Sequence, residues 1–224
     1  MRFALSRSVP VPTRLRLVPF PRRAQNRLLD LVLGIVIPIA LLPLMLVIAL
    51  AIRLDSPGPV LYRQQRVGRA GMTFEMWKFR SMYVGSVDTN HRQAAAAWFA
   101  GNPSPGGYKA KDDARITRVG RALRRTSLDE LPQFFNVIRG EMSLVGPRPA
   151  IPYELAYYEP AYFERQAVKP GITGPWQVFG RDRLAAPEMM ALDLRYVREC
   201  SLALDLKILV LTLPALLGLV PKGV

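Results

Sequence analysis

The residues RRTSLDELPQFFNVIRGEMSLVGPRP, from Arg124 to Pro149, decide the fold around the candidate site of this chain. Ser127 and Glu130 have the spacing of a capping box, a reciprocal pair of hydrogen bonds that starts many helices. The apolar residues that follow recur at the spacing of one helix face: Leu131, Phe134, Phe135 and Ile138. A helix is therefore predicted to begin near Leu128 and to stop at Gly140.

Asp129 and Glu130 form an adjacent carboxylate pair in the first turn of this predicted helix. The exposed N–H groups and the dipole of a first turn favour anions, either these carboxylates or an incoming phosphate. Neighbouring residues lie about 100° apart around a helix, so one carboxylate could attack a substrate while the other holds a metal ion. Acidic pairs are also common at helix N-termini where they only complement the helix dipole and have no catalytic role. Pro132 either starts the helix proper or bends its first turn.

Arginine is frequent around the carboxylate pair. From Arg115 to Arg148 the sequence carries seven arginines against three acidic residues, Asp129, Glu130 and Glu141. This excess of positive charge indicates an anionic ligand. The planar guanidinium suits bidentate contact with phosphate oxygens, so the stretch favours phosphate chemistry.

A long apolar run points to a membrane. Leu31–Ile52 comprises 22 residues without a charged or polar side chain, which is long enough to cross a bilayer. Pro38 and Pro43 lie near its middle, where each removes a helix hydrogen bond and favours a bend. Arginines flank the run on both sides, whereas a span would export one flank. The sequence therefore favours a re-entrant hairpin that enters and leaves on the cytoplasmic face, with a kinked span as the alternative.

Several chemistries are excluded by composition. Cys200 is the only cysteine and His91 the only histidine, which excludes a Cys/His zinc cluster or a disulfide within one chain. The sequence has no GxxxxGK[ST] phosphate loop and no GxGxxG motif after a strand, so any nucleotide must be bound by other elements. The net charge of +14 would suit nucleic acid as well as an anionic membrane. Because of the apolar run, membrane lipids are the predicted partner, and no nucleic acid partner is predicted.

Three segments carry a family resemblance: DDARITRVGRALRRTSLDELPQFFNVIRGEMSLVGPRP at 112–149, WKFRSM at 77–82 and KPGITGPWQVFGR at 169–181. Through them the chain resembles the bacterial sugar transferase family, the monotopic phosphoglycosyl transferases, over roughly residues 26–212. Members of that family move a sugar-1-phosphate from a nucleotide sugar to polyprenyl phosphate at the cytoplasmic membrane. The resemblance implies a membrane-bound enzyme that makes a polyprenyl-diphospho-sugar from a UDP-sugar, as the first step of a surface glycan pathway such as exopolysaccharide biosynthesis.

The resemblance also implies the catalytic residues. Asp129 is the expected nucleophile, which forms a covalent phosphosugar intermediate and expels a nucleoside monophosphate. Glu130 is the expected Mg²⁺ ligand, since this ion keeps most of its waters and needs few protein ligands. Lys78 matches a family lysine and is expected near the nucleophile.

Further matches to the family concern phosphate binding and the membrane. Phosphate contacts are expected from three arginines: Arg124, Arg148 and Arg181. Arg80 is a weaker match, for which a surface salt bridge is an equal alternative. The family's helix break falls at Leu42 and Pro43, where a leucine replaces a frequent serine and removes a hydroxyl that could bond a freed carbonyl.

The predicted organisation follows from these observations. The fold class is α/β, dominated by helices, with a few short strands such as Met142–Val145. The predicted parts are a flexible basic arm (1–25), a re-entrant membrane anchor broken at Pro43 (26–54), a small cytosolic catalytic domain (55–207) and a C-terminal interfacial apolar helix (208–224). A buried core helix is the alternative for the last part. The predicted location is the bacterial cytoplasmic membrane, with the active site on the cytosolic face.

Two rival functions remain open at this point. A non-catalytic membrane adaptor would use the basic surface to bind anionic lipid or nucleic acid. A phosphatase would act through the same aspartate. The sequence selects neither the sugar nor the glycan pathway, and it leaves the oligomeric state open, a homo-oligomer included.

Overall fold

The computed structural model describes residues 20–85, 89–101, 113–180 and 184–216. Within these ranges helices dominate, and four short strands form two separate two-stranded sheets. The helix-dominated α/β class predicted from the sequence is therefore confirmed. Arg181, most of the 1–25 arm and residues 217–224 lie outside the described ranges.

The elements follow one another along the chain in this order. The α-helices are α1 (Phe20–Ala40), α2 (Leu42–Asp55), α3 (Thr89–Phe99), α4 (Arg118–Thr126), α5 (Gln133–Arg139), α6 (Pro175–Phe179), α7 (Ala186–Glu199) and α8 (Leu202–Leu216). The strands are β1 (Leu61–Val67), β2 (Thr73–Phe79), β3 (Ser143–Val145) and β4 (Gly171–Thr173). Short 3-10 helices are η1 (Arg69–Gly71), η2 (Leu128–Glu130), η3 (Pro152–Tyr157) and η4 (Pro160–Ala167).

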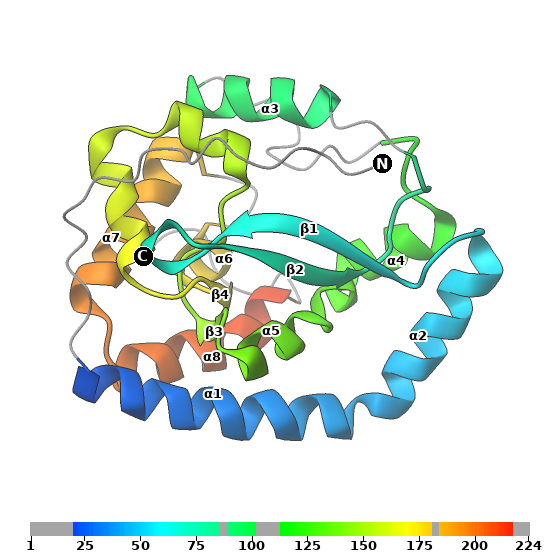
Figure 1. The fold of residues 1–224 in the computed structure, drawn as a ribbon, viewed down its shortest axis with the longest axis horizontal. Helices are drawn as coiled ribbons and strands as arrows, with labels where there is room; N and C mark the ends of the chain where they lie inside the picture. The colour runs from blue at the N-terminus through cyan, green and yellow to red at the C-terminus, as the bar shows by residue number, and fades with distance from the viewer. Residues whose placement is uncertain (1–19, 86–88, 102–112, 181–183, 217–224) are drawn as a thin grey trace.

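The strands β1 and β2 form an antiparallel hairpin that crosses the middle of the molecule (Figure 1). The turn between them places Ala70 and Gly71 at φ 55° and 75°, the left-handed conformation that a tight reversal needs. Tyr62 of β1 lies opposite Lys78 of β2. The strands β3 and β4 pair in parallel, and β3 confirms the strand predicted at Met142–Val145.

The apolar run bends at Leu41, next to the predicted break at Leu42 and Pro43. The axes of α1 and α2 differ by 61°. Pro43 lies in the first turn of α2, where its missing N–H would have no partner within the helix. Within the described ranges no single helix has the length and apolar composition to cross a bilayer, although the bent pair Arg27–Ala40 and Leu42–Asp55 meets that test together.

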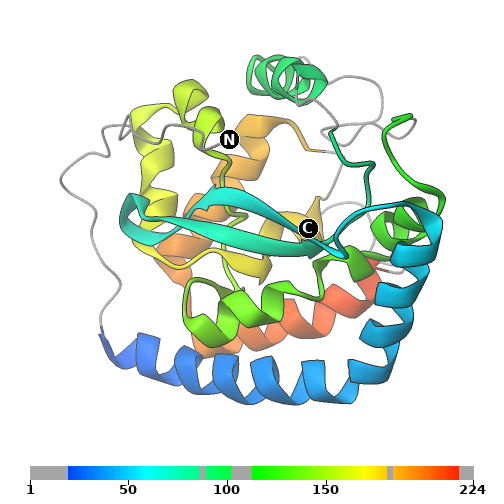
Figure 2. The same cartoon turned by 45° about the vertical axis from the view of Figure 1, so that its right-hand side comes forward.

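Helix α1 is attached to the rest of the chain through polar bonds as well as apolar packing. Arg27 donates to the carbonyl oxygens of Val137 and Ile138 at the end of α5, at 2.5 Å and 2.7 Å. Asp30 is buried and accepts bonds from Ser143 Oγ and Leu144 N–H in β3. Both views show α1 along the lower edge, with α5 and α8 between it and the hairpin (Figure 1; Figure 2). The apolar helix and the mixed domain thus share one interior.

Exposed apolar side chains gather on three helices, of which α1 contacts both others. On α1 and α2 they are Leu28, Val32, Ile35, Val36, Ile39, Leu42, Leu44, Leu46, Val47, Leu50 and Leu54. On α8 they are Leu202, Leu206, Val210, Leu213 and Leu216. Single exposed apolar residues are ordinary, but continuous rows of this kind mark an interaction surface.

Helix α8 begins at Leu202, so its first turns precede the predicted C-terminal helix and reach into the interior. Asp205 is 2% exposed and accepts a 2.6 Å hydrogen bond from the Tyr196 hydroxyl. Burial raises the pKa of Asp205 to about 6; the Tyr196 hydrogen bond opposes this rise, and the charge of Asp30 adds to it. Asp205 is therefore a buried acid that titrates near neutral pH.

We expect Asp205→Asn to be more stable than the wild type above about pH 6. The folded state holds the Asp205 proton up to about pH 6, whereas an ordinary aspartate has a pKa of 3.8, so ionisation costs stability as the pH rises through this window. The full cost is at most about 3 kcal/mol, and the asparagine oxygen can still accept from Tyr196. Urea unfolding in detergent should show the advantage of the variant growing with pH and then levelling off. Equal pH dependence in both proteins would contradict this.

Candidate active site

The segment between α4 and α5 carries the carboxylate pair, but it is not the predicted helix start. Ser127 adopts a left-handed backbone (φ 58°), and its side chain makes no N-cap hydrogen bond. The 3-10 turn η2 follows, and α5 begins only after Pro132, which occupies its N-cap position. The predicted capping box is therefore wrong. Pro132 is the physical reason, because it lacks the N–H that would bond the Leu128 carbonyl in a helix started at Leu128.

Asp129 and Glu130 both lie on η2, where successive residues are about 120° apart. Asp129 is 8% exposed, whereas Glu130 is only partly buried. Glu130 Oε1 accepts a 2.9 Å charged hydrogen bond from Lys78 Nζ, which β2 supplies. The structure thus brings Lys78 to the carboxylate pair, which comes from a distant part of the sequence.

A buried asparagine holds β2 beside this turn. Asn136 of α5 is fully buried, and its Oδ1 accepts from the Trp77 N–H at 3.0 Å. Its Nδ2 donates to the Glu75 carbonyl at 2.7 Å and to Glu141 Oε2 at 2.6 Å. The carboxamide therefore bonds two main-chain groups of β2 as a neighbouring strand would, which fixes Lys78 relative to η2. Sequence reasoning missed Asn136, although a polar residue amid buried helix positions was a usable signal.

Gly140 closes α5 as predicted. It lies at φ 82°, and its N–H bonds back to the last turn of the helix. Only glycine adopts this conformation without a steric penalty. The short helix that carries Asn136 is therefore bounded by Pro132 and Gly140.

Arg148 lies in the loop after β3, and Glu154 of η3 binds its guanidinium. Nη1 and Nη2 lie 3.1 Å and 3.3 Å from the two Glu154 carboxylate oxygens. Glu154 is 1% exposed and also accepts from the Ile151 N–H at 2.7 Å. Bidentate charged bonds of this kind fix the plane of a guanidinium, so Arg148 is held in one orientation.

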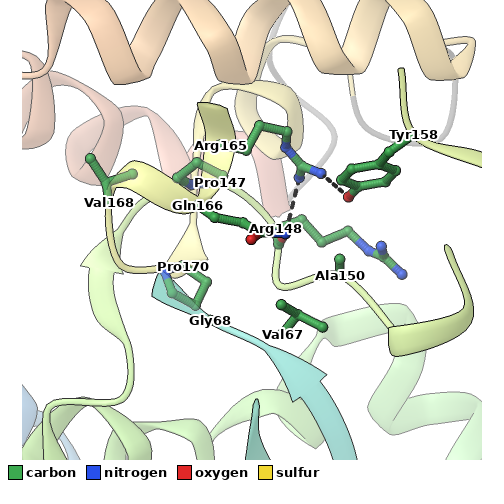
Figure 3. A pocket seen from close by; sticks show the side chains of 10 residues that line it. All are labelled: Val67, Gly68, Pro147, Arg148, Ala150, Tyr158, Arg165, Gln166, Val168 and Pro170. Carbon is green, nitrogen blue, oxygen red and sulfur yellow. Dashed lines mark hydrogen bonds between the residues drawn. The ribbon is translucent and has the colours of Figure 1, made fainter. Parts of the chain in front are cut away.

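A second arginine holds the main chain of the same loop (Figure 3). Arg165 Nη2 donates to the Arg148 carbonyl at 2.9 Å, and other nitrogens of Arg165 contact the Tyr158 hydroxyl and Asp193. Arg165 and Asp193 are 5% and 0% exposed, so the two charges neutralise each other in the interior. Burial raises the pKa of Tyr158 to about 12, which keeps the phenol protonated. The adjoining cavity of about 20 Å³ is too small for a substrate.

Sequence reasoning assigned no role to Arg165 or Asp193. Asp193 nevertheless shares the helical spacing of Met189 and Tyr196, which lie on the buried face of α7. A carboxylate on an apolar helix face is a signal of a buried cationic partner. Arg165 offered no comparable signal, because η4 is irregular.

Arg80 requires a correction. It is 4% exposed and donates to the carbonyl oxygens of Ser56 and Pro57, at 2.7 Å and 2.9 Å, where α2 ends. This buried position of Arg80 fits neither the predicted phosphate contact nor the alternative surface salt bridge. Arg80 satisfies carbonyl groups at a helix C-terminus instead.

The remaining predicted phosphate contacts are Arg124 and Arg181. Arg124 is half-buried in the last turn of α4, directly before the turn at Ser127. Arg115, and more weakly Arg124, hold the pKa of Asp113 below its usual range. Arg181 lies outside the described residues.

The carboxylates of the site fit a hard cation with few protein ligands. No cluster of three or more Cys, His, Asp or Glu residues occurs in the described ranges. Asp129 and Glu130 could offer one or two carboxylates, which is the usual protein share of a Mg²⁺ site completed by water and phosphate. A carboxylate pair in contact with a lysine is an arrangement that suits a protein that handles phosphate groups.

Comparison with known proteins gives the family. The family model described as bacterial sugar transferase matches residues 21–218. The exopolysaccharide production protein ExoY of Sinorhizobium fredii is 39% identical over 197 residues, which cover 85% of this chain and 84% of that protein. The chain belongs to the bacterial sugar transferase family.

Two further relatives carry the name UDP-glucose:undecaprenyl-phosphate glucose-1-phosphate transferase. The protein of Caulobacter vibrioides is 41% identical over 210 residues, which cover 89% of this chain and 73% of the relative. The protein of Xanthomonas campestris pv. campestris is 44% identical over 198 residues, which cover 84% of this chain and 38% of the relative. The chain thus spans about two-fifths of the length of several relatives that it matches.

We expect Asn136→Leu to destabilise the protein by about 2–4 kcal/mol, because the Trp77 N–H and the Glu75 carbonyl would stay buried without partners. Urea unfolding in detergent measures this loss. Thr126→Ala, at an exposed position of α4, serves as the control and should change stability by less than about 0.5 kcal/mol. Equal stability of the two variants would show that Asn136 does not hold β2.

Proposed function

We propose that this chain transfers a sugar-1-phosphate from a UDP-sugar to polyprenyl phosphate and releases UMP. The observation that carries the proposal is the buried carboxylate of Asp129 beside Glu130, whose charge Lys78 meets at 2.9 Å. The names of the Caulobacter and Xanthomonas relatives support UDP-glucose and undecaprenyl phosphate as the substrate class. The product is a polyprenyl-diphospho-sugar.

In the first step an oxygen of Asp129 attacks the phosphorus next to the sugar. A bond forms between that oxygen and phosphorus, and the bond from phosphorus to the bridging oxygen breaks. UMP leaves with the electron pair of the broken bond. Because Asp129 is only 8% exposed, little bulk water reaches its carboxylate.

In the second step an oxygen of polyprenyl phosphate attacks the same phosphorus. The bond to Asp129 breaks, and the carboxylate is restored for another turnover. Dividing the transfer in this way lets a soluble donor and a lipid acceptor occupy the site in turn.

The surrounding cations stabilise the oxygens around the reacting phosphorus. Lys78 lies at the carboxylate pair, and Glu154 holds the Arg148 guanidinium oriented before substrate arrives. Arg124 and Arg181 are further proposed phosphate contacts. Preorganised cations lower the barrier because they need not reorient as charge develops on the phosphate.

Mg²⁺ is the proposed cofactor, and Glu130 is the residue that would hold it. When bound, this ion neutralises negative charge on the phosphate oxygens. The donor set supports the assignment, because carboxylates without cysteine or histidine suit a hard cation.

The exposed apolar rows on α1, α2 and α8 support a place at the membrane. We propose that they lie in the cytoplasmic leaflet of the bacterial inner membrane, with α1 and α2 as a re-entrant anchor and the active site on the cytosolic face. Arg27 and Asp30 bond the main domain at the start of α1, so the domain is fixed beside the lipid boundary. A lipid phosphate could then reach Asp129 without leaving the membrane surface.

Asp129→Asn should lower sugar-phosphate transfer by about three orders of magnitude or more, since the amide cannot form the phosphosugar intermediate. Glu130→Gln should be nearly as severe. The assay supplies a radiolabelled UDP-sugar with or without undecaprenyl phosphate and measures UMP and labelled lipid. Without the acceptor, wild-type enzyme should release up to one equivalent of UMP.

The control for this experiment is Glu199→Gln, which removes a carboxylate from an exposed ion pair on α7 and should keep full activity. Undiminished turnover by Asp129→Asn would remove the covalent step. A wild-type chain that releases no UMP but binds anionic vesicles would favour the membrane adaptor.

The re-entrant anchor predicts that both flanks of the apolar run face the cytosol. In a Cys200→Ser background, single cysteines at Ser8 and at Met72, which is 73% exposed, can be labelled with an impermeant maleimide. Both should react only after spheroplasts are lysed. Labelling of the residue 8 cysteine in intact spheroplasts, with residue 72 protected, would establish a kinked span instead.

A further inference from the structure

A second, larger depression lies along strand β1. It measures about 350 Å³, and its lining comes from β1, α3 and the start of η3: Tyr62, Arg63, Gln64, Gln65, Arg92, Ile151, Pro152 and Tyr153. This volume lies within the range of small-molecule sites. None of the residues proposed to take part in the transfer lines it.

The position of the depression connects it to both halves of the proposed phosphate site. Tyr62 lies opposite Lys78 in the hairpin, and Lys78 contacts Glu130. On the other wall, the Ile151 N–H bonds to Glu154, whose carboxylate holds Arg148. The lining is thus linked to Lys78 through the pairing of the two strands and to Arg148 through Glu154.

The polar groups of the depression offer hydrogen-bond donors and positive charge. Gln64 Oε1 accepts a 2.6 Å bond from Arg66 Nη2. Because a guanidinium has only donors, the amide oxygen of Gln64 must face Arg66, and the amide nitrogen is the group left for a ligand. The Arg92 guanidinium lies 4.9 Å from the centre of the Tyr153 ring, which adds a cation and an aromatic surface. Among the described residues that line the depression there is no Asp or Glu.

We propose that this depression binds the nucleoside part of the UDP-sugar donor, an inference that rests on the proposed function. Uracil presents carbonyl oxygens to its surroundings and a planar face for stacking, which suit an amide donor, guanidiniums and tyrosines. A hexose presents many hydroxyl donors and is better served by carboxylate acceptors, which this lining does not offer. Gln64 is therefore a base-reading residue, and Tyr62 and Tyr153 form the walls of the base site.

The most informative variant is Gln64→Glu. It keeps an oxygen for Arg66, so the partly buried bond between the two side chains survives, but it replaces the donor that faces the base by an acceptor. Binding of UMP should weaken about tenfold or more, because a carbonyl would then meet a carboxylate. Cytosine carries an amino donor at the corresponding position, so the preference for UMP over CMP should shrink or reverse.

Calorimetry on the full chain in lipid nanodiscs, with UMP and CMP as the probes, measures these affinities without any turnover. Met72→Glu adds the same charge at the end of the hairpin, outside the depression, and should leave both affinities unchanged. A nonspecific charge effect would weaken both nucleotides equally, whereas base reading changes their ratio. Tyr62→Ala should weaken both nucleotides by lost stacking.

The outcomes separate this inference from the proposed function. A wild type that binds UMP but makes no lipid-linked product would refute the transfer reaction and leave the nucleoside site standing. An unchanged UMP to CMP ratio in Gln64→Glu, with normal transfer in the wild type, would overturn the nucleoside site. If instead only the selectivity among UDP-hexoses changed, the depression would be the sugar site and our assignment would be wrong.

Discussion

The site depends on one carboxamide, that of Asn136, acting as a substitute for a missing strand. β2 pairs with β1 along one edge only, and the two bonds from Asn136 satisfy main-chain groups on its other edge. An unpaired strand edge in the interior would carry the cost of buried polar groups without partners. Because Asn136 sits on α5, immediately after the turn with Asp129 and Glu130, the same bonds set the distance between Lys78 and that turn. The strand and the carboxylate pair are therefore positioned by one residue.

Much of the positive charge of this chain serves the fold rather than a ligand. Among the described residues, five arginines donate to main-chain carbonyl oxygens: Arg27, Arg53, Arg66, Arg80 and Arg165. Inside the basic stretch itself, Arg115 pairs with Asp113, and Arg139 lies over the Trp77 ring. An excess of arginine in a sequence thus overstates the charge available to phosphate. The irregular loops and short helices of this protein leave many carbonyl groups outside regular ladders, and guanidiniums bond several of them.

Features set by neighbouring residues could be predicted from the sequence, and features set by distant contacts could not. The stop at Gly140, the strand at Met142–Val145 and the bend beside Pro43 follow from local backbone preferences. The capping box failed because Pro132 outweighs a favourable spacing. The roles of Arg80 and Asn136 depend on partners more than 20 residues away, such as Ser56 and Glu75, whose identity no local pattern reveals. Family resemblance named Asp129 and Lys78 as site residues, but only the fold supplies the contact between Lys78 and Glu130.

The loop that carries Arg148 is positioned by two buried guanidiniums rather than by its prolines alone. Arg165 bonds the Arg148 carbonyl at 2.9 Å, and Arg66 bonds the next carbonyl, that of Pro149, also at 2.9 Å. The rigid fork of Arg66 also holds Gln64. The Arg66 guanidinium therefore bonds both the Pro149 carbonyl and the Gln64 amide. A shift of either group would strain both of these hydrogen bonds. The position of the loop that carries Arg148 and the shape of the depression lined by Gln64 therefore both depend on buried guanidiniums that bond main-chain carbonyl oxygens.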